Sequence, residues 1–325
     1  MNIAVVSPHT VRNGNTTIAS LLAMDISTRG KSVCLAHTAL KSPAMYEYFS
    51  LRELGDDKTA NPSKLVSMLK AGAVKPEEIT EYCKNITTNL DAFTVNDKKF
   101  TVDDLDYMIT YILDRFPYEI KVFDVDNNYD DPITKKVLGK CDFIVLVITQ
   151  AIIELYDFRS ELKRLEKLLK YKPSMIVVNK FDRHICDIKS VQRVLGATVS
   201  KKSSWITVRY NPQVVRFENF GKLLDLYNAM RNNDISVIDV ASDIKLVGNR
   251  VMKCRQQERV SSAKRRTESI IKEAKALEEA SGKAEAAGKQ GAESETEAKT
   301  GAEPADDKIK MSLDKDSSGG ETTEE

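Results

Sequence analysis

The sequence lacks the features that mark secreted, membrane-spanning and zinc-binding proteins. Its five cysteines are scattered and include no Cys-x-x-Cys pair; they are Cys34, Cys83, Cys141, Cys186 and Cys254. This arrangement argues against a disulfide framework and is typical of reduced cysteines in a cytosolic protein. The longest apolar run, from Phe143 to Thr149, is much shorter than the roughly 20 residues that cross a bilayer. We therefore expect a cytoplasmic protein without a transmembrane helix.

An excess of charge of one sign is also missing, because 49 Lys and Arg stand against 48 Asp and Glu. The overall balance hides two segments of opposite net charge. From Lys245 to Lys275 there are ten Lys or Arg and three Glu, and from residue 281 to 325 there are twelve acids and six lysines. No apolar periodicity survives after residue 281, and a polar segment of this composition predicts a disordered acidic tail.

The basic segment from Lys245 to Lys275 contains no aromatic residue, so it is a poor candidate for stacking on bases. Small and apolar residues recur in it at helical spacing: Ala263, Thr267, Ile270, Ala274 and Leu277. The predicted helix has three interpretations: it is solvated, it contacts DNA or an anionic membrane surface, or it binds a protein partner. Contact with a membrane surface would recruit this cytoplasmic protein there. We divide the chain into a domain (residues 1–243), a basic helical extension (244–280) and the tail (281–325).

Residues 1–243 alternate between strand-like and helical patterns. The strand-like runs are residues 3–7, 32–36, 90–94, 120–124, 143–149, 175–178 and 205–209. Several are apolar at consecutive positions, as strands buried on both faces are. Helix starts are marked between them by Pro76, by Asp131-Pro132 and by the pair Thr101 and Asp104. The pattern predicts an α/β domain with a mostly parallel sheet and helices on both faces.

The most informative segment is the loop after the first strand-like run. It ends with Gly14-Asn15-Thr16-Thr17 where a phosphate-binding loop has Gly-Lys-Thr-Thr, and a helical pattern follows from Ile18. Backbone N–H groups at such a helix start cradle phosphates, the lysine reaches the β- and γ-phosphates, and the hydroxyl holds Mg²⁺. Two interpretations stay open. Asn15 and the threonines either contact phosphate or only cap the helix.

The order of further segments resembles the ParA/MinD-type deviant Walker ATPases, which have a P-loop NTPase-like fold. The similar segments are residues 10–17, 30–36, 118–124, 141–149, 177–182 and 208–212 with Gly221. The resemblance implies ATP or ADP with Mg²⁺ as ligand and a homodimer as the assembly. The nucleotide-binding residues that it implies are Arg12, Asn13, Gly14, Asn15, Thr16, Thr17, Asn179 and Pro212. It also implies Mg²⁺ ligation by Thr16 and, through water, by Asp124, with Asn179 at the adenine edge.

The departures from this family concern its charges. Thr10 and Asn15 replace the two loop lysines, and His37-Thr38-Ala39 replaces an Asp-x-Asp motif that positions water. Because phosphoryl transfer depends on neutralising developing charge, these changes predict weak or absent hydrolysis. A similar pattern, in which the fold is kept and the loop motif is partly lost, is known in ATPase-like proteins of Tad-type pilus loci, such as TadZ and CpaE. It is also known in partition-like proteins of conjugative elements.

The favoured function is therefore that of a degenerate homologue that positions or assembles a larger machine, such as a pilus, secretion or conjugation apparatus, whose protein components are its partners. One alternative is an active but atypical ATPase of plasmid or chromosome partition, in which Arg12 replaces the lysine. The other is an interaction module that binds no nucleotide.

Overall fold

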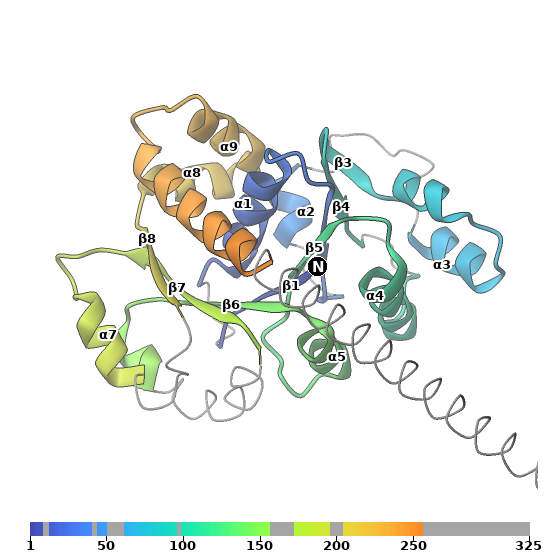
Figure 1. Ribbon diagram of the computed structural model, residues 1–325, viewed down its shortest axis with the longest axis horizontal. Coiled ribbons are helices and arrows are strands. Elements are labelled where there is room, and N and C mark those ends of the chain that lie inside the picture. Colours follow the sequence, from blue (N-terminus) through green and yellow to red (C-terminus); the bar gives the residue numbers. More distant parts are fainter. Residues whose placement is uncertain are drawn as a thin grey trace, which may run out of the picture. The chain divides into compact units, whose positions relative to one another are not determined.

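The computed structural model describes residues 1–8, 13–40, 44–50, 62–95, 99–156, 172–195 and 204–255. All of them belong to one compact unit, Met1–Arg259. Its centre is an eight-stranded sheet with the order β3-β4-β2-β5-β1-β6-β7-β8 (Figure 1). The strands are β1 (Asn2–Val6), β2 (Val33–His37), β3 (Lys84–Thr87), β4 (Leu90–Phe93), β5 (Ile120–Asp124), β6 (Phe143–Ile148), β7 (Ser174–Phe181) and β8 (Ser204–Arg209).

All neighbouring strands run parallel except β3 and β4, which form an antiparallel pair at one edge. Strand β1 lies between β5 and β6, and its Val5 is in register with Asp124 on one side and Val145 on the other. The carboxyl ends of β1, β2 and β5 therefore meet at one edge of the sheet. The predicted α/β fold with a mostly parallel sheet is confirmed.

Helices cover both faces of the sheet because successive side chains of each strand point to opposite faces. Ala4 and Val6 of β1 belong to one buried cluster, with apolar residues of α3, α4, α5 and α7. Ile3 and Val5 belong to the other cluster, with α1, α9 and residues 237–251. The helices are α1 (Asn15–Ser27), α2 (Ala44–Tyr48), α3 (Pro62–Lys70), the 3₁₀-helix η1 (Pro76–Tyr82), α4 (Val102–Arg115), α5 (Pro132–Lys140), α7 (Ile188–Leu195), α8 (Pro212–Asn219) and α9 (Leu223–Arg231).

Residues 238–255 form a further helix, and the predicted domain boundary at residue 243 falls inside it. Ile244, Val247 and Val251 of this helix are at most 1% exposed within the second cluster. The basic Arg255 lies against the domain too, where its Nη2 donates to Glu119 at 3.0 Å. The first part of the predicted extension therefore belongs to the core of the compact unit.

The rest of the predicted extension and the predicted tail, residues 256–325, lie outside the described residues. The same is true of the loop residue Arg12. In the part of the chain that the structure describes, no helix has the length and apolar character needed to cross a membrane.

Candidate functional site

The start of α1 is fixed by contacts that only glycine permits at position 14. Gly14 has φ +79° and precedes the first helical residue. Asn179, at the end of β7, donates from Nδ2 to the Asn13 carbonyl oxygen at 2.7 Å. A Cβ atom on Gly14 would lie 2.3 Å from that Nδ2 atom, which is closer than Cβ atoms approach other heavy atoms in real proteins. Asn13 and Gly14 are therefore held against β7, and the close approach leaves no room for a side chain at position 14.

The N-terminus of α1 offers backbone donors at the carboxyl edge of the sheet. The first N–H groups of a helix have no partner within it, and they favour an anion. No acidic residue occupies the first turn of α1, and its N-cap residue is Gly14, which has no side chain to cap the helix. The hydroxyl of Thr17, in the first turn of α1, donates a hydrogen bond to Glu218 of α8. These features fit a phosphate group at the helix start.

Asn15, which stands where the loop lysine would be, turns its amide group toward the sheet. Its Nδ2 donates to Asp124 Oδ1 at 2.6 Å and to the carbonyl oxygens of Val5 at 3.1 Å and Val125 at 3.3 Å. Thr16 donates from its hydroxyl to the other carboxylate oxygen of Asp124 at 2.7 Å. Asn15 and Thr16 thus donate hydrogen bonds to both carboxylate oxygens of Asp124, the residue that was expected to face Mg²⁺.

Burial raises the pKa of Asp124 to about 6, which the hydrogen bonds from Thr16 and Asn15 only partly offset. Asp126 adds to the rise through its like charge. Asp124 is still mostly ionised at neutral pH, as the partner of a hydrated cation must be.

A cavity of about 230 Å³ lies beside Thr16 and Asp124. Among the described residues, it is lined by Asn15, Thr16, His37, Ala39, Ala44, Met45, Asp124, Val125, Asp126 and Asn127. His37 and Asp124 are register partners on β2 and β5, which brings both to this cavity. Two of the lining residues, Asn15 and Asn127, each have a buried amide oxygen without a hydrogen-bond partner among the described residues. Buried polar atoms without a partner are rare in native proteins and favour ordered water beside them.

His37 is the most buried of these polar residues, with 3% of its surface exposed. Its Nε2 accepts a hydrogen bond from the Val95 backbone N–H at 3.3 Å, so the neutral ring carries its proton on Nδ1. Burial lowers its pKa to about 4, which the nearby Ala39 carbonyl only partly offsets. His37 is therefore neutral at neutral pH, with its Nδ1–H beside the Ala39 carbonyl.

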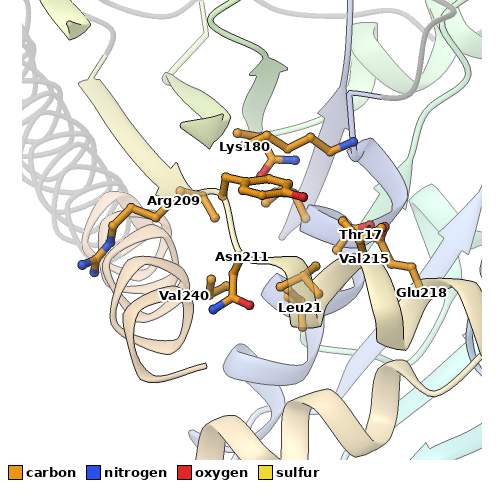
Figure 2. Close-up of a pocket in the computed structure, with 13 residues that line it drawn as sticks. Thr17, Leu21, Lys180, Arg209, Asn211, Val215, Glu218 and Val240 are labelled. Carbon is orange, nitrogen blue, oxygen red and sulfur yellow. Dashed lines mark hydrogen bonds between the residues drawn. The ribbon is translucent and has the colours of Figure 1, made fainter. Parts of the chain in front are cut away.

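A second pocket lies on the other side of the α1 start, between β7, β8 and α8 (Figure 2). The polar or charged residues that line it include Thr17, Asn179, Lys180, Arg209, Tyr210, Asn211 and Glu218. Its enclosed space is about 20 Å³, room for about one water molecule. A larger group enters only if the rim moves, and Tyr210 at the rim is 52% exposed.

The structure brings most of the predicted site residues together. Asn13 to Thr17, Asp124 and Asn179 all meet around the start of α1, as the hydrogen bonds above record. Pro212 begins α8 and does not line the second pocket, whereas its neighbour Asn211 does and also caps α8 by accepting from the Gln213 N–H at 2.8 Å. Lys180, Asn127 and Glu218 were not predicted from the sequence. Only Lys180 had a usable signal, because it directly follows Asn179.

Comparisons with known proteins agree on the fold. No family model matches the sequence, and no curated protein matches it. A chain of the MinC:MinD cell division protein complex from Aquifex aeolicus is 14% identical, with a TM-score of 0.56, over 78% of this chain and 96% of that chain. The septum site-determining protein MinD from Pyrococcus horikoshii, complexed with Mg-ADP, is 15% identical, with a TM-score of 0.55, over 77% and 99%.

A putative plasmid partition protein from Borrelia burgdorferi, bound to AMPPNP, is 18% identical, with a TM-score of 0.51, over 79% of this chain and 98% of that chain. At such identities the likeness concerns the arrangement of helices and strands. The chain has the ParA/MinD-like α/β fold of P-loop ATPases.

Proposed function

We propose that this chain is a degenerate ParA/MinD-like protein that positions or assembles a larger protein machine. Nucleotide with Mg²⁺ serves it as a structural or switching ligand, bound weakly, and ATP hydrolysis is at or near background. The candidate machines are a pilus, a secretion system and a conjugation apparatus. Support comes from a fold shared with a partition protein and with a component of the MinC:MinD complex, together with a site whose charges differ from those that hydrolysis requires.

The observation that carries this proposal is the orientation of Asn15. Its amide N–H groups donate to Asp124, Val5 and Val125, so they are not available to a terminal phosphate in the space beside Asp124. Asp124 and Asp126 line that space. Phosphoryl transfer needs preorganised positive charge around the transferred group, whereas these carboxylates oppose it. Gly14 and the N-terminus of α1, whose first turn has no acidic residue, still fit a phosphate, so the site suits binding better than turnover.

Steady-state ATP turnover tests the proposal directly. We expect the purified protein to hydrolyse ATP at the background rate in the presence of Mg²⁺, and Asp124→Ala to leave that rate unchanged. Asn15→Lys is expected to tighten nucleotide binding by roughly 1.5–3 kcal/mol through one charge-assisted hydrogen bond, measured by calorimetry. Robust turnover that is lost in Asp124→Ala would contradict the proposal and favour the atypical partition ATPase with Arg12 as its cation. Absence of nucleotide binding in both proteins would favour the nucleotide-free interaction module.

A partner surface is the other part of this proposal. Ile153, Tyr156 and Ile185 are exposed by 80%, 57% and 74%, and all three follow the carboxyl ends of β6 or β7. Exposed apolar side chains at one edge of a sheet are suited to a protein partner or a second copy of the chain. We further propose a cytoplasmic protein whose segment from Lys245 to Lys275 contacts DNA or an anionic membrane surface.

A further inference from the structure

A groove lies at the C-terminal end of α1, at the opposite end of this helix from the phosphate loop. It has a volume of about 290 Å³ and is bounded by α1, α9 and the helix at residues 238–255 (Figure 1). None of the described residues that line it belongs to the candidate nucleotide site or to the exposed apolar edge around Ile153. The nucleotide site therefore does not explain this groove.

The groove is fixed in place by a close contact between two of its helices. A Cβ atom on Gly248, in the helix at residues 238–255, would lie 1.9 Å from Asp25 Oδ2 of α1, which is too close for any side chain. Arg29 binds both helices, because it donates to Asp25 Oδ2 at 2.5 Å and to Asn249 Oδ1 at 2.7 Å. The walls of the groove are thus preformed, which reduces the entropy that is lost when a ligand binds.

One part of the groove is apolar and open to solvent. Ile238 is 40% exposed, and Met230 and Ala241 line the groove together with it. Leu246, which is 55% exposed, lies about two turns further along the same helix. Exposed apolar side chains that gather at one place mark interaction sites. A groove of this volume has room for an apolar side chain of a partner.

The charged part of the groove has an excess of cations. Arg231 and Lys245 line it and are exposed, and neither side chain forms an ion pair or a hydrogen bond with another described residue. Asp25 is the one carboxylate among the described lining residues, and it already pairs with Arg29 at 2.5 Å. Burial raises the pKa of Asp25, and Arg29 and then Lys245 lower it in part. An acidic group that enters the groove therefore meets two exposed cations and one carboxylate that is paired.

The other acidic residues of this part of the chain do not line the groove. Asp239 and Asp243 lie on the side of their helix that faces β8, where they pair with Arg209 at 2.8 and 2.9 Å. Asp234 accepts a hydrogen bond from the Ser236 N–H at 2.9 Å in the turn before the helix. The positive charge of Arg231 and Lys245 is therefore open to a partner.

We propose that this groove binds an acidic segment of a protein partner. One apolar side chain of that segment enters the groove beside Ile238 and Met230, and carboxylates next to it pair with Arg231 and Lys245. Apolar anchors in pockets commonly contribute most to such binding, and complementary charges select the partner. The inference goes beyond the proposed function, which places a partner at the edge around Ile153 and gives this groove no role.

Methyl NMR of the full chain tests the proposal with the synthetic peptide Ala-Glu-Glu-Leu-Glu-Glu-Ala, at low salt and without nucleotide. We expect the peptide to shift the methyl signals of Ile238 and Met230, while those of the exposed Ile153 and Ile185 stay in place. Replacing the leucine of the peptide by alanine is expected to weaken binding by about tenfold. Replacing its glutamates by glutamine is expected to have an effect of about the same size.

Variants of the protein test the two cations. Arg231→Glu combined with Lys245→Glu is expected to weaken binding of the peptide by about tenfold or more. The matched control, Lys189→Glu combined with Arg193→Glu, changes the net charge by the same amount on α7 and is expected to bind like the unaltered chain. Thermal midpoints show that each variant remains folded.

Four results would overturn the proposal. The first is that the peptide shifts neither Ile238 nor Met230, and the second is that it shifts Ile153 and Ile185 in their place. The third is that the two double variants bind equally. The fourth is that double-stranded DNA shifts Ile238 and the peptide does not, which would assign the cations to nucleic acid. Because no nucleotide is added, each of these results leaves the proposed binding of nucleotide unaffected.

Discussion

Asp124 and His37 line the same cavity, and burial moves their pKa values in opposite directions. The pKa of Asp124 rises from 3.8 to about 6, and that of His37 falls from 6.5 to about 4. Between pH 3.8 and about 6 the folded chain keeps a proton on Asp124 that the unfolded chain has lost, so this group makes stability fall as pH rises. Between about pH 4 and 6.5 the unfolded chain holds a proton on His37 that the folded chain lacks, so this group makes stability rise.

These opposed contributions predict a pair of variants with opposite pH profiles. In Asp124→Asn only His37 remains, and we expect the free energy of unfolding to rise by on the order of 3 kcal/mol between pH 4 and 6.5. In His37→Gln only Asp124 remains, and the free energy of unfolding is expected to fall between pH 4 and 6. Urea denaturation at several pH values measures both.

The unaltered protein is the control for this pair, because every other titrating group is common to all three proteins. Its profile is expected to lie between the two variants. Three parallel profiles would show that neither group carries the shifted pKa. Asp126 and the donors Asn15 and Thr16 face Asp124 and stay in place in both variants.

Single residues of the site were predictable from sequence only where the signal is local. Gly14, Thr16 and Asp124 follow from strand–loop–helix and strand-end positions. The hydrogen bond between Asn179 and Asn13 joins residues 166 positions apart, which no local pattern specifies. The direction of Asn15 was also beyond sequence reasoning, since its amide is equally able to face phosphate or Asp124. The structure resolves this choice in favour of Asp124.

At the scale of elements, prediction worked for strands buried on both faces and failed for half-polar ones. β6 consists entirely of buried apolar residues, and in β5 all residues but the last, Asp124, are buried; both strands were predicted. β3 has the sequence Lys-Asn-Ile-Thr and lies at the sheet edge, so it carries neither an apolar run nor a clear alternation. The helix at residues 238–255 was predicted only from residue 244, as the start of a basic extension. Its packing in the core was missed, although Val240, Ile244, Val247 and Val251 recur every three or four positions.

This helix predicts where the chain can be shortened. Ending the chain at residue 243 removes the buried Ile244, Val247 and Val251, a loss of roughly 1.5–3 kcal/mol for each side chain. Most domains have about 5–15 kcal/mol of stability in total. We therefore expect the chain 1–243 to lose its cooperative thermal transition, while the chain 1–259 keeps a midpoint close to that of the full protein.

Single substitutions in the same helix give the matched control. Val247→Ala is expected to cost about 1–3 kcal/mol in urea denaturation, because it leaves a cavity in the core. Leu246→Ala, at a neighbouring position that is 55% exposed, is expected to change stability by less than about 0.5 kcal/mol. Equal effects of the two, or a folded chain 1–243, would show that the helix is not part of the core.

At the scale of the whole molecule, a positively charged segment and a negatively charged segment follow each other toward the C-terminal end of the sequence. Part of the positive segment is used for folding, since Arg255 binds Glu119 and Arg250 donates to the Ser204 hydroxyl at 3.1 Å. Lys264, Arg265 and Arg266 follow later in the sequence, within the net charge of +7 from Lys245 to Lys275. They are the cations that we expect to meet an anionic surface.

Binding to double-stranded DNA or to vesicles rich in anionic lipid tests this expectation through salt. Electrostatic contact releases counterions, so binding at low ionic strength should weaken steeply as salt is added. Reversal of Lys264, Arg265 and Arg266 to Glu is expected to abolish it while the thermal midpoint stays unchanged. The matched control reverses the exposed Lys189, Arg193 and Lys222 to Glu, which changes the net charge by the same amount.

If both triple variants weaken binding equally, the net charge of the whole protein determines binding and the basic segment has no specific role. If the unaltered protein binds neither surface at low salt, the segment is solvated or binds a protein partner, and Ile270→Asp then separates these two, because it disrupts only the partner-binding helix.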